Sequence, residues 1–413
     1  MTHIDNTRNR RYDVIVWGAT GFTGRLVAEY LASRYPPGDS LRWAIGGRNR
    51  DKLVSLVEDL RLTGDGPDLI VADSHDTRAM QDLARSTRVV LTTVGPYARY
   101  GSELVAACAA AGTHYCDLCG ESQWIRKMID RHHAAAIDSG AKIVMCCGFD
   151  SIPSDMGVYA MQRRASSEYH QQCERITLLV RAMRGGASGG TLASMMNAID
   201  EARADRDVAR TLRDPYGLNP AGERNGPDGS DQRGAHFDDD AQTWTAPFIM
   251  AGINTRVVRR SNALSGYAYG RDFRYHEASI AGKGFGGRIK ATLMGLGLGL
   301  FIVMAAIPFT RRHLVQRFSP KPGEGPSASE RENGFFKLLM VGRLPDGTLL
   351  KQTVTGDRDP GYGSTSKMLA ESAVCLARDN LDDNAGCLTP AIAMGDALLD
   401  RLQQNAGLTF EPE

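Results

Sequence analysis

The stretch Tyr12–Arg25 reads Tyr-Asp-Val-Ile-Val-Trp-Gly-Ala-Thr-Gly-Phe-Thr-Gly-Arg. Its apolar, β-branched run stops at Gly18, and two further glycines follow at intervals of three, Gly21 and Gly24. A helix-like pattern then begins at Leu26. The order predicts a buried strand, a tight turn, and a helix whose amino terminus points back at the turn. Such a helix end offers unpaired N–H groups and a partial positive charge, which suit a pyrophosphate.

The three glycines are spaced Gly-x-x-Gly-x-x-Gly. They remove the Cβ atoms that would hold phosphates and the neighbouring strand away. Because the triplet directly follows a strand, we predict a dinucleotide-binding turn; a purely structural glycine turn is the alternative. The residues predicted to contact the cofactor here are Gly18, Thr20, Gly21, Phe22, Thr23 and Gly24.

Strands and helices alternate over the first 150 residues. Apolar runs at 41–45, 69–73, 89–94, 115–118 and 142–146 are separated by helical patterns. This alternation predicts an α/β fold, with residues 1–150 forming a Rossmann-type, doubly wound parallel sheet. At 413 residues the chain is long enough for a second domain. We expect an α+β substrate domain over 151–388, and a C-terminal helix in 389–413 that packs back on the Rossmann domain.

The end of the second strand indicates which dinucleotide binds. In this fold that position lies beside the adenosine ribose, where an acidic residue binds the 2′-hydroxyl of NAD. In this chain Gly47 and Arg48 occupy the end of the second strand, with Arg50 nearby. A guanidinium suits a 2′-phosphate, so NADP(H) is favoured over NAD(H); two solvated arginines are the alternative. Asp73, after the third strand, is expected to meet the adenine ring.

Two loops supply the candidates for chemistry. Ligands of open α/β sheets bind outside the carboxyl ends of the strands. The segment after the fourth strand should therefore line the nicotinamide half of the cofactor, through Thr93, Val94, Gly95 and Pro96. Tyr97 completes this loop, and Ser151 lies in the polar loop 148–155 after the sixth strand. We predict these two as the groups near the nicotinamide, although residues 148–155 are also ordinary turn and helix-capping residues.

The second half of the chain is less regular. Residues 215–240, rich in Gly, Pro, Asp and Arg, predict a long surface loop or lid; a segment without fixed structure is the alternative. Residues 334–341 and 348–355 alternate around a turn and predict an antiparallel hairpin. Residues 291–310 carry no charge. A helix or hairpin that seats on a membrane face or an acyl chain, a buried core helix, and a membrane span all remain open for them.

Composition and absent motifs narrow the chemistry. The formal net charge of +1 gives no field that recruits nucleic acid. Eight cysteines without a disulfide spacing predict a cytoplasmic, reducing setting, and no second ligand pair accompanies Cys116 and Cys119, so no metal is expected. No tyrosine has a lysine four residues on, which excludes the short-chain dehydrogenase active site. What remains is hydride transfer from a bound nicotinamide.

With these residues in view, the chain resembles the saccharopine dehydrogenase-like oxidoreductases, and within them the trans-acting enoyl reductase subfamily. The likeness covers nearly the whole chain. The segments that carry it are 18–24, Gly47-Arg48, 94–97, Asp117, Gly120-Glu121, 148–155, 254–263, 269–271, 321–323 and 389–399.

The resemblance implies an NADP-dependent oxidoreductase acting on CH–CH groups. Members are implied to reduce an enoyl intermediate held on the acyl-carrier domain of a modular polyketide synthase, during synthesis of phthiocerol-type and phenolphthiocerol lipids. A lipid-like acyl substrate, membrane contact through 291–310, a place at the inner face of the plasma membrane and a homodimer are further expectations. The alternative is a membrane- or lipid-associated NADP-binding protein that acts on another substrate or has no turnover.

Overall fold

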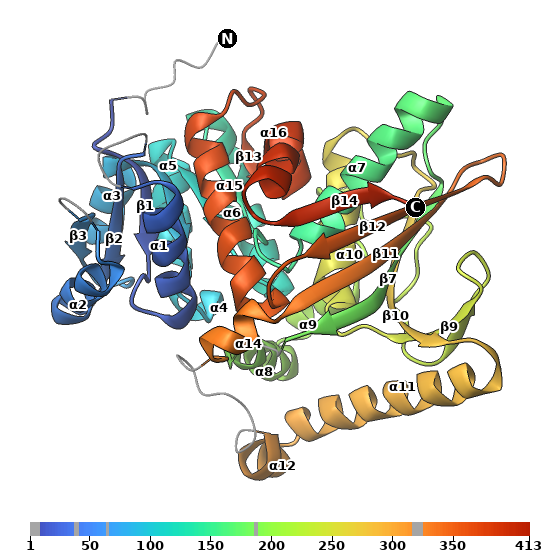
Figure 1. Cartoon of the computed structure of the whole chain (residues 1–413). Coiled ribbons are helices and arrows are strands. Elements are labelled where there is room, and N and C mark those ends of the chain that lie inside the picture. The colour runs from blue at the N-terminus through green and yellow to red at the C-terminus, as the bar shows by residue number, and fades with distance from the viewer. Residues whose placement is uncertain (1–8, 37–40, 63–65, 186–188, 316–324) are drawn as a thin grey trace. The chain divides into compact units, whose positions relative to one another are not determined.

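Two seven-stranded sheets organise the chain (Figure 1). The computed structural model describes residues 9–36, 41–62, 66–185, 189–315 and 325–413. The chain forms two compact units. Unit 1 takes its residues from 1–149, 323–325 and 361–406, and unit 2 takes its residues from 150–322, 326–360 and 407–413. The resemblance segment 321–323 lies outside the described residues.

Unit 1 contains a parallel sheet with the strand order β13-β6-β5-β4-β1-β2-β3. The interior strand β1 is buried at every position, which explains its apolar run Val14–Trp17, since helices cover both faces of such sheets. The predicted Rossmann-type sheet is confirmed. Its strands are β1 Tyr12–Trp17, β2 Trp43–Gly47, β3 Asp68–Val71, β4 Thr87–Thr92, β5 His114–Asp117, β6 Lys142–Val144 and β13 Gly386–Leu388.

Nine helices are described in unit 1, and their sequence order alternates with the strands as far as β6. They are α1 Phe22–Arg34, α2 Arg50–Leu60, α3 Thr77–Ser86, α4 Tyr97–Tyr100, α5 Ser102–Ala111, α6 Ser122–Ser139, α15 Thr365–Arg378 and α16 Pro390–Gln404, with the π-helical turn η2 Pro360–Ser364 at the division between units. The predicted division at residue 388 differs from this arrangement. Residues 361–388 belong to unit 1 because β13 pairs in parallel with β6.

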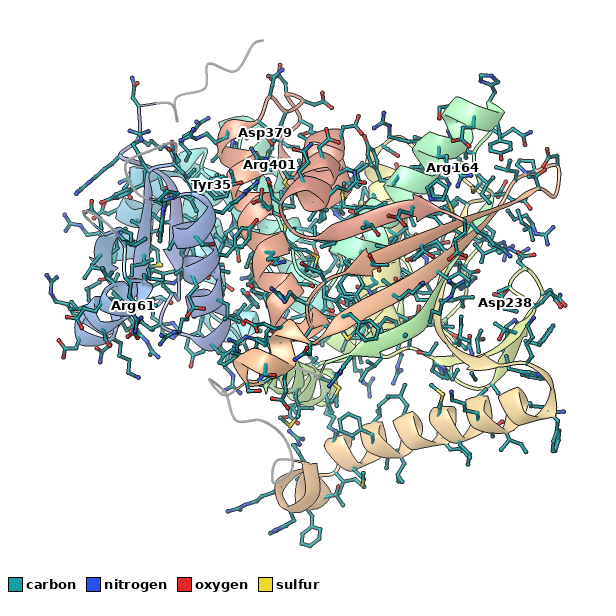
Figure 2. All side chains as sticks on the ribbon, viewed as in Figure 1. Tyr35, Arg61, Arg164, Asp238, Asp379 and Arg401 are labelled. Atoms are coloured by element: carbon teal, nitrogen blue, oxygen red, sulfur yellow. The ribbon has the colours of Figure 1, made fainter. Side chains whose placement is uncertain are left out.

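A polar cluster joins the late helices to the early part of unit 1 (Figure 2). The Glu371 carboxylate of α15 accepts hydrogen bonds from the hydroxyls of Tyr30 (2.7 Å) and Tyr35 (2.9 Å). Arg401 of α16 donates to the same carboxylate at 3.1 Å and pairs with Asp379. The Glu371 side chain is fully buried, so these donors replace the water that its charge has lost. Residues 361–406 therefore complete the nucleotide-binding domain.

Unit 2 contains a mixed sheet with the order β14-β12-β11-β7-β10-β9-β8, in which only the β7–β10 pair is parallel. The predicted hairpin is confirmed as β11 and β12. The strands are β7 Arg175–Arg184, β8 His236–Asp238, β9 Thr243–Pro247, β10 Arg274–Gly282, β11 Phe335–Arg343, β12 Leu349–Gly356 and β14 Leu408–Pro412. The helices are α7 Ile152–Tyr169, α8 Gly189–Ala204, α9 Arg206–Arg213, α10 Ala251–Leu264, α11 Gly284–Ala306, α12 Pro308–Thr310, η1 Arg311–Val315 and α14 Ala328–Glu332.

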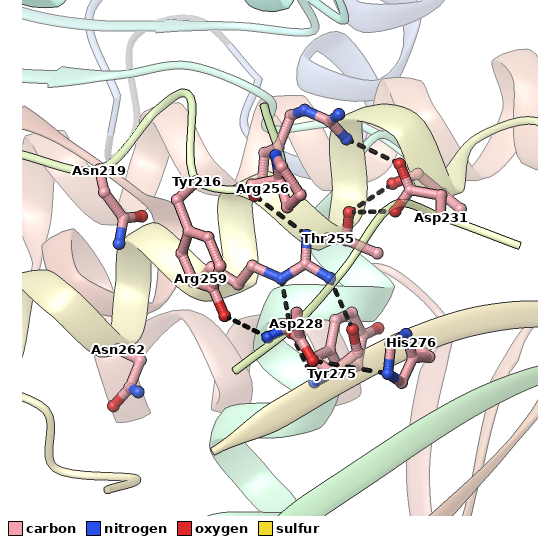
Figure 3. Close-up of polar contacts among 12 residues, drawn as sticks. Tyr216, Asn219, Asp228, Asp231, Thr255, Arg256, Arg259, Asn262, Tyr275 and His276 are labelled. Carbon is pink, nitrogen blue, oxygen red and sulfur yellow. Dashed lines mark hydrogen bonds and ion pairs between the residues drawn. The ribbon is translucent and has the colours of Figure 1, made fainter. Parts of the chain in front are cut away.

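The segment 215–240 is mostly loop, as predicted, but it has a fixed structure held by contacts with α10, so the alternative of a segment without fixed structure was wrong (Figure 3). Arg259 of α10 is 3% exposed, and its Nε donates to Asp228 at 2.7 Å. Its two terminal nitrogens donate to the carbonyls of Pro215 and Tyr275. Arg256 holds Asp231 in the same way at 2.9 Å. The segment is anchored by these charge pairs together with the buried side chains of Tyr216 and Leu218, which its hydrophilic composition did not indicate.

Helix α11 contains most of the uncharged segment 291–310. Gly287, Ala291 and Gly295 are buried on one side of this helix, and Ala291 packs with Ala246 of β9 and Ala281 of β10. Most of its large apolar side chains are exposed, so it is not a buried core helix. Among the described residues it is the one helix whose length and composition would allow it to cross a membrane, and 17% of its most apolar window is buried.

Candidate cofactor and active site

The turn between β1 and α1 closes on itself so tightly that two of its glycines have no room for a side chain. Gly18 adopts a positive φ of 89°, and a Cβ on it would lie 2.5 Å from the Val94 side chain. A Cβ on Gly24 would lie 2.2 Å from the Gly18 carbonyl oxygen. Thr93 donates from its hydroxyl to that same carbonyl at 3.2 Å. The loops after β1 and β4 are thus held against each other at the point predicted from the glycine spacing.

The first turn of α1 has the features of an anion-binding site. Gly21 is its N-cap, and no side chain caps the helix. The first N–H groups of such a helix are left without intrahelical partners, and the helix dipole favours negative charge there. Thr20 and Gly21 are exposed, whereas Phe22 and Thr23 are half-buried. This cradle fits a pyrophosphate, and it brings together the six residues predicted from the glycine motif.

Gly47 ends β2, and Arg48 follows it directly. Arg48 is exposed, and its side chain forms no hydrogen bond or ion pair with any residue that the structure describes. Asp73 follows β3 and is also exposed, and its carboxylate accepts the backbone N–H of His75 at 2.8 Å. Arg48 is thus available to an external phosphate, while the assignment of Asp73 to the adenine ring stays a prediction.

The loop after β4 is held by a carboxylate that sequence reasoning missed. Glu121 is 2% exposed and accepts the backbone N–H groups of Tyr97 (2.8 Å) and Ala98 (3.0 Å). It therefore caps the first turn of α4 from outside that helix and fixes the end of the segment Thr93–Pro96. Gly120-Glu121 was noticed only as a family-like pair, and no spacing rule links it to a helix more than twenty residues earlier.

Tyr97 points into unit 1. Its ring is 4% exposed and packs against Trp124, and its hydroxyl donates to the Thr92 carbonyl at 3.2 Å. Burial raises the pKa of Tyr97 well above its usual value, with a further contribution from Asp117. The phenol is therefore neutral and already donates its proton within the domain. Its predicted catalytic role stays a prediction.

Ser151 belongs to unit 2, so the two predicted catalytic residues lie in different units. It is the N-cap residue of α7, but its side chain does not cap that helix. Its hydroxyl is fully buried and has no hydrogen-bond partner among the described residues. The preceding residue, Asp150, has its pKa raised to about 7 by burial and then by the charge of Glu277. Asp150 was not predicted, because nothing in the loop sequence indicates that Glu277 is near.

A buried carboxylate network lies behind this loop within unit 2. Glu277 of β10 accepts hydrogen bonds from Ser154 (2.6 Å), Tyr275 (2.7 Å) and the Asn254 amide (2.9 Å). Burial raises the pKa of Glu277, and the three donors oppose that change. A second pair joins α10 to the same loop, since Ser261 donates to Asp155. These contacts fix the first turn of α7 and the side chains around Asp150.

The cysteines give no sign of a metal centre. All eight are buried and unpaired by disulfides. No group of three or more His, Cys, Asp or Glu side chains with metal-ligand geometry occurs in the described ranges. Burial raises the pKa of Cys116 and Cys119 well above the usual thiol value, so both remain neutral thiols rather than metal-binding thiolates.

The comparisons with known proteins agree with this geometry. Residues 14–144 match the family description "Saccharopine dehydrogenase NADP binding domain". A Mycobacterium tuberculosis protein named as a trans-acting enoyl reductase is 44% identical, with 97% of each chain covered. A trans-acting enoyl reductase of Mycobacterium ulcerans is 39% identical at the same coverage. The chain therefore belongs to the saccharopine dehydrogenase-like family, in its trans-acting enoyl reductase group. The resemblance found in the sequence is confirmed.

Apo saccharopine dehydrogenase (L-Glu forming) from Saccharomyces cerevisiae shares the fold of this family member. The TM-score is 0.53 at 12% identity, with 97% of this chain and 99% of that chain covered. A likeness at this identity concerns the fold alone. The likeness to the yeast enzyme extends over both units, and the sequence similarity to the mycobacterial relatives does as well.

Unit 1 is the NADP-binding domain of an oxidoreductase of this family. The glycine cradle and the uncapped start of α1 fit the pyrophosphate, and Arg48 fits the 2′-phosphate that distinguishes NADP from NAD. Bound NADPH supplies a hydride, and the chain must bind it, orient it and exclude water.

Replacing Arg48 with glutamate tests the assignment of the 2′-phosphate. Hydrogen bonds to charged groups contribute about 1.5–3 kcal/mol, so affinity for NADPH should fall about 10- to 100-fold. Affinity for NADH should fall little or rise, because the new carboxylate can accept a ribose hydroxyl. Fluorescence titration with both nucleotides measures the two constants. Arg61→Glu, on the far end of α2, is the matched charge control. An equal loss for both nucleotides would contradict the assignment.

Proposed function

We propose that the protein is an NADPH-dependent trans-acting enoyl reductase. Its substrate is an α,β-unsaturated acyl thioester held on the acyl-carrier domain of a modular polyketide synthase. One observation carries this proposal: the similarity to proteins named as trans-acting enoyl reductases covers 97% of the chain and so includes unit 2 as well as the NADP-binding domain. An NADP-binding domain alone would support many reductases.

The reaction requires a hydride at the β-carbon and a proton at the α-carbon, with an enolate between the two steps. We propose Asp150, which directly precedes the predicted catalytic residue Ser151, as the group that protonates the α-carbon. Burial raises the pKa of Asp150, and the neighbouring Ser151 hydroxyl has no hydrogen-bond partner among the described residues. A carboxyl group with a pKa near 7 is protonated often enough at neutral pH to act as a general acid.

The pH dependence of Asp150 follows from this pKa. Its carboxyl group is protonated below pH 7 and ionised above, so turnover should decrease as the pH rises through about 7. In Asp150→Asn, turnover should fall about 10²- to 10⁴-fold, as expected for removal of a general acid. NADPH affinity should stay unchanged, because Asp150 lies outside unit 1. Turnover at the wild-type level would exclude Asp150 from proton transfer.

The same ionisation should affect stability. Below pH 3.8 the carboxyl is protonated in both the folded and the unfolded chain. Between pH 3.8 and about 7 only the folded state keeps the proton, so the free energy of unfolding should decrease with rising pH. The free energy of unfolding of Asp150→Asn should decrease less than that of the wild type as the pH rises through this range. Urea unfolding at pH 5 and pH 8 measures the difference, and equal losses in both proteins would contradict burial of this group.

We further propose that the products are complex lipids of the cell envelope, of the phthiocerol and phenolphthiocerol type, and that the protein works at the inner face of the plasma membrane. The names of the mycobacterial relatives support the reaction, and the exposed apolar helix α11 supports the location. Deletion of the gene followed by lipid mass spectrometry tests the pathway. The expected lipids are lighter by one hydrogen pair for each missed reduction; an unchanged lipid profile would contradict the proposal.

A further inference from the structure

Helix α11 buries its small residues and exposes its large apolar ones, which is the opposite of an ordinary surface helix. The buried side holds small residues (Gly287, Ala291, Gly295 and Ala305), while the large apolar residues face outward. A helix on the surface of a globular protein normally buries its large apolar face. The outer face, defined by the exposed large apolar residues of α11 and of residues 307–309 just after it, consists of Phe285, Ile289, Leu293, Met294, Leu296, Leu300, Ile302, Val303, Ile307 and Phe309.

The exposure of these side chains is large. Phe285 is 77% exposed, Leu296 66% and Phe309 71%. Figure 1 shows α11 as a long helix with α12 at its far end, lying beside β9 within unit 2. Contiguous apolar patches of this extent on a protein surface mark a binding site for another protein or a membrane.

Both ends of α11 are attached to unit 2, so the helix lies along the surface of that unit. At its start, Ala291 packs on Ala246 of β9 and Ala281 of β10. Just past its end, Arg311 forms two hydrogen bonds of 2.6 Å with the carboxylate of Asp200 on α8. If α11 crossed a membrane, its two ends would lie on opposite sides of the bilayer. Ala291 and Arg311 could then not both keep their contacts with unit 2. The outer face can instead enter a bilayer lengthwise, with the rest of unit 2 remaining in water.

The charges around the outer face favour an anionic surface. From Lys283 to His313 the sequence contains five Lys and Arg residues and no Asp or Glu. Lys290 and Arg312 are exposed near the two ends of the apolar stretch, and no charged residue lies between Lys290 and Arg311. Basic residues beside a buried apolar face add attraction to anionic lipids.

A second copy of the chain fits this face less well. The stripe Ile289, Leu293, Leu296, Leu300 and Val303 has the spacing of a helix–helix seam. Such a seam in water needs polar flanks, whereas here the flanks are glycines and further apolar residues, including Gly297 and Gly299. Pairing two copies would also bring together basic ends without acidic partners in this segment. A bilayer requires neither a polar rim nor acidic partners.

We propose that α11 docks the protein lengthwise on an anionic lipid bilayer, inserting its outer face among the lipids. This inference rests on the proposed location at a membrane and is independent of the reaction. Full-length protein should float with phosphatidylcholine–phosphatidylglycerol vesicles and bind less to phosphatidylcholine alone. Leu296→Glu/Leu300→Glu should reduce the bound fraction at least about tenfold, and Lys290→Glu/Arg312→Glu should remove the preference for anionic vesicles.

The controls separate docking from folding and from catalysis. Val54→Glu/Ile249→Glu changes two other exposed apolar residues and should leave vesicle binding unchanged. NADPH titration checks that each variant is folded, and turnover of a soluble carrier-bound substrate tests the reaction independently. Absence of vesicle binding, or binding that survives Leu296→Glu/Leu300→Glu, would overturn the inference. A wild-type dimer that this variant dissociates, without vesicle binding, would assign the face to a second copy. Resistance to alkaline extraction from cell membranes would indicate a span.

Discussion

Replacing Gly24 with alanine should weaken NADPH binding at least about 100-fold. The new Cβ would lie 2.2 Å from the Gly18 carbonyl oxygen and 2.8 Å from the Gly18 carbonyl carbon. Both are backbone atoms, so no side-chain rotation can relieve the contact. Gly18 has a positive φ and would clash with Val94 if it carried a side chain, so the turn has little freedom to move. The start of α1 must shift, and its N–H groups would leave their positions around the pyrophosphate.

The expected magnitudes for Gly24→Ala are large. We expect a loss of about 3 kcal/mol or more in the free energy of unfolding, at the upper end for an overpacked site. NADPH affinity should fall at least about 100-fold, because two or more charge-assisted hydrogen bonds are lost. Urea unfolding and fluorescence titration measure the two effects.

Gly252→Ala is the matched control for this substitution. Gly252 also lies in the first turn of a helix, α10, but nothing lies within 4 Å of the Cβ that alanine would add. This variant should bind NADPH normally and be as stable as wild type or slightly more so, because alanine favours the helix. Normal NADPH binding by Gly24→Ala would show that the turn is not the pyrophosphate site.

Replacing Arg259 with alanine should cost unit 2 about 3–5 kcal/mol of stability, since it leaves the buried charge of Asp228 without its partner. The side chains of this pair are 2% and 0% exposed, so water cannot compensate. The same substitution removes the donors to the carbonyls of Pro215 and Tyr275. Segment 215–240 should therefore loosen, which proteolysis or hydrogen exchange would detect (Figure 3).

Two further variants make this test specific. Arg210 is 78% exposed and pairs with Asp207 on the surface of α9, so Arg210→Ala should change stability by no more than about 0.5 kcal/mol. Arg259→Met combined with Asp228→Asn removes both charges and should recover part of the loss. Equal effects of Arg259→Ala and Arg210→Ala would contradict the anchoring role of the buried pair.

The regular part of the fold was predictable because local sequence determines it. Periodicity and turn chemistry predict the glycine turn at 18–24 and the alternation of strands and helices up to residue 144. They also predict the hairpin at Pro345-Asp346-Gly347. The seventh strand of the Rossmann sheet, β13, was not predictable. It has only three residues, and its partner β6 lies more than 240 positions earlier.

The parts of the candidate site that come from local sequence were also predictable. Residues of the cradle and Arg48 are neighbours in sequence or occupy known positions of the fold. Glu121 and Glu277 were missed because each acts on a loop that is distant in sequence. The fixed structure of segment 215–240 was missed for a related reason: arginines on α10 hold it, and pairing between distant charges leaves no periodic pattern.

Purified protein incubated with deuterium-labelled NADPH and an enoyl thioester on an acyl-carrier domain provides the most direct test of the proposed function. The label is placed on the transferable hydrogen, and the carrier-bound product is analysed by mass spectrometry. The proposal predicts oxidation of one NADPH for each double bond reduced, with one deuterium at the β-carbon. Tight NADPH binding without oxidation by any enoyl thioester would contradict it.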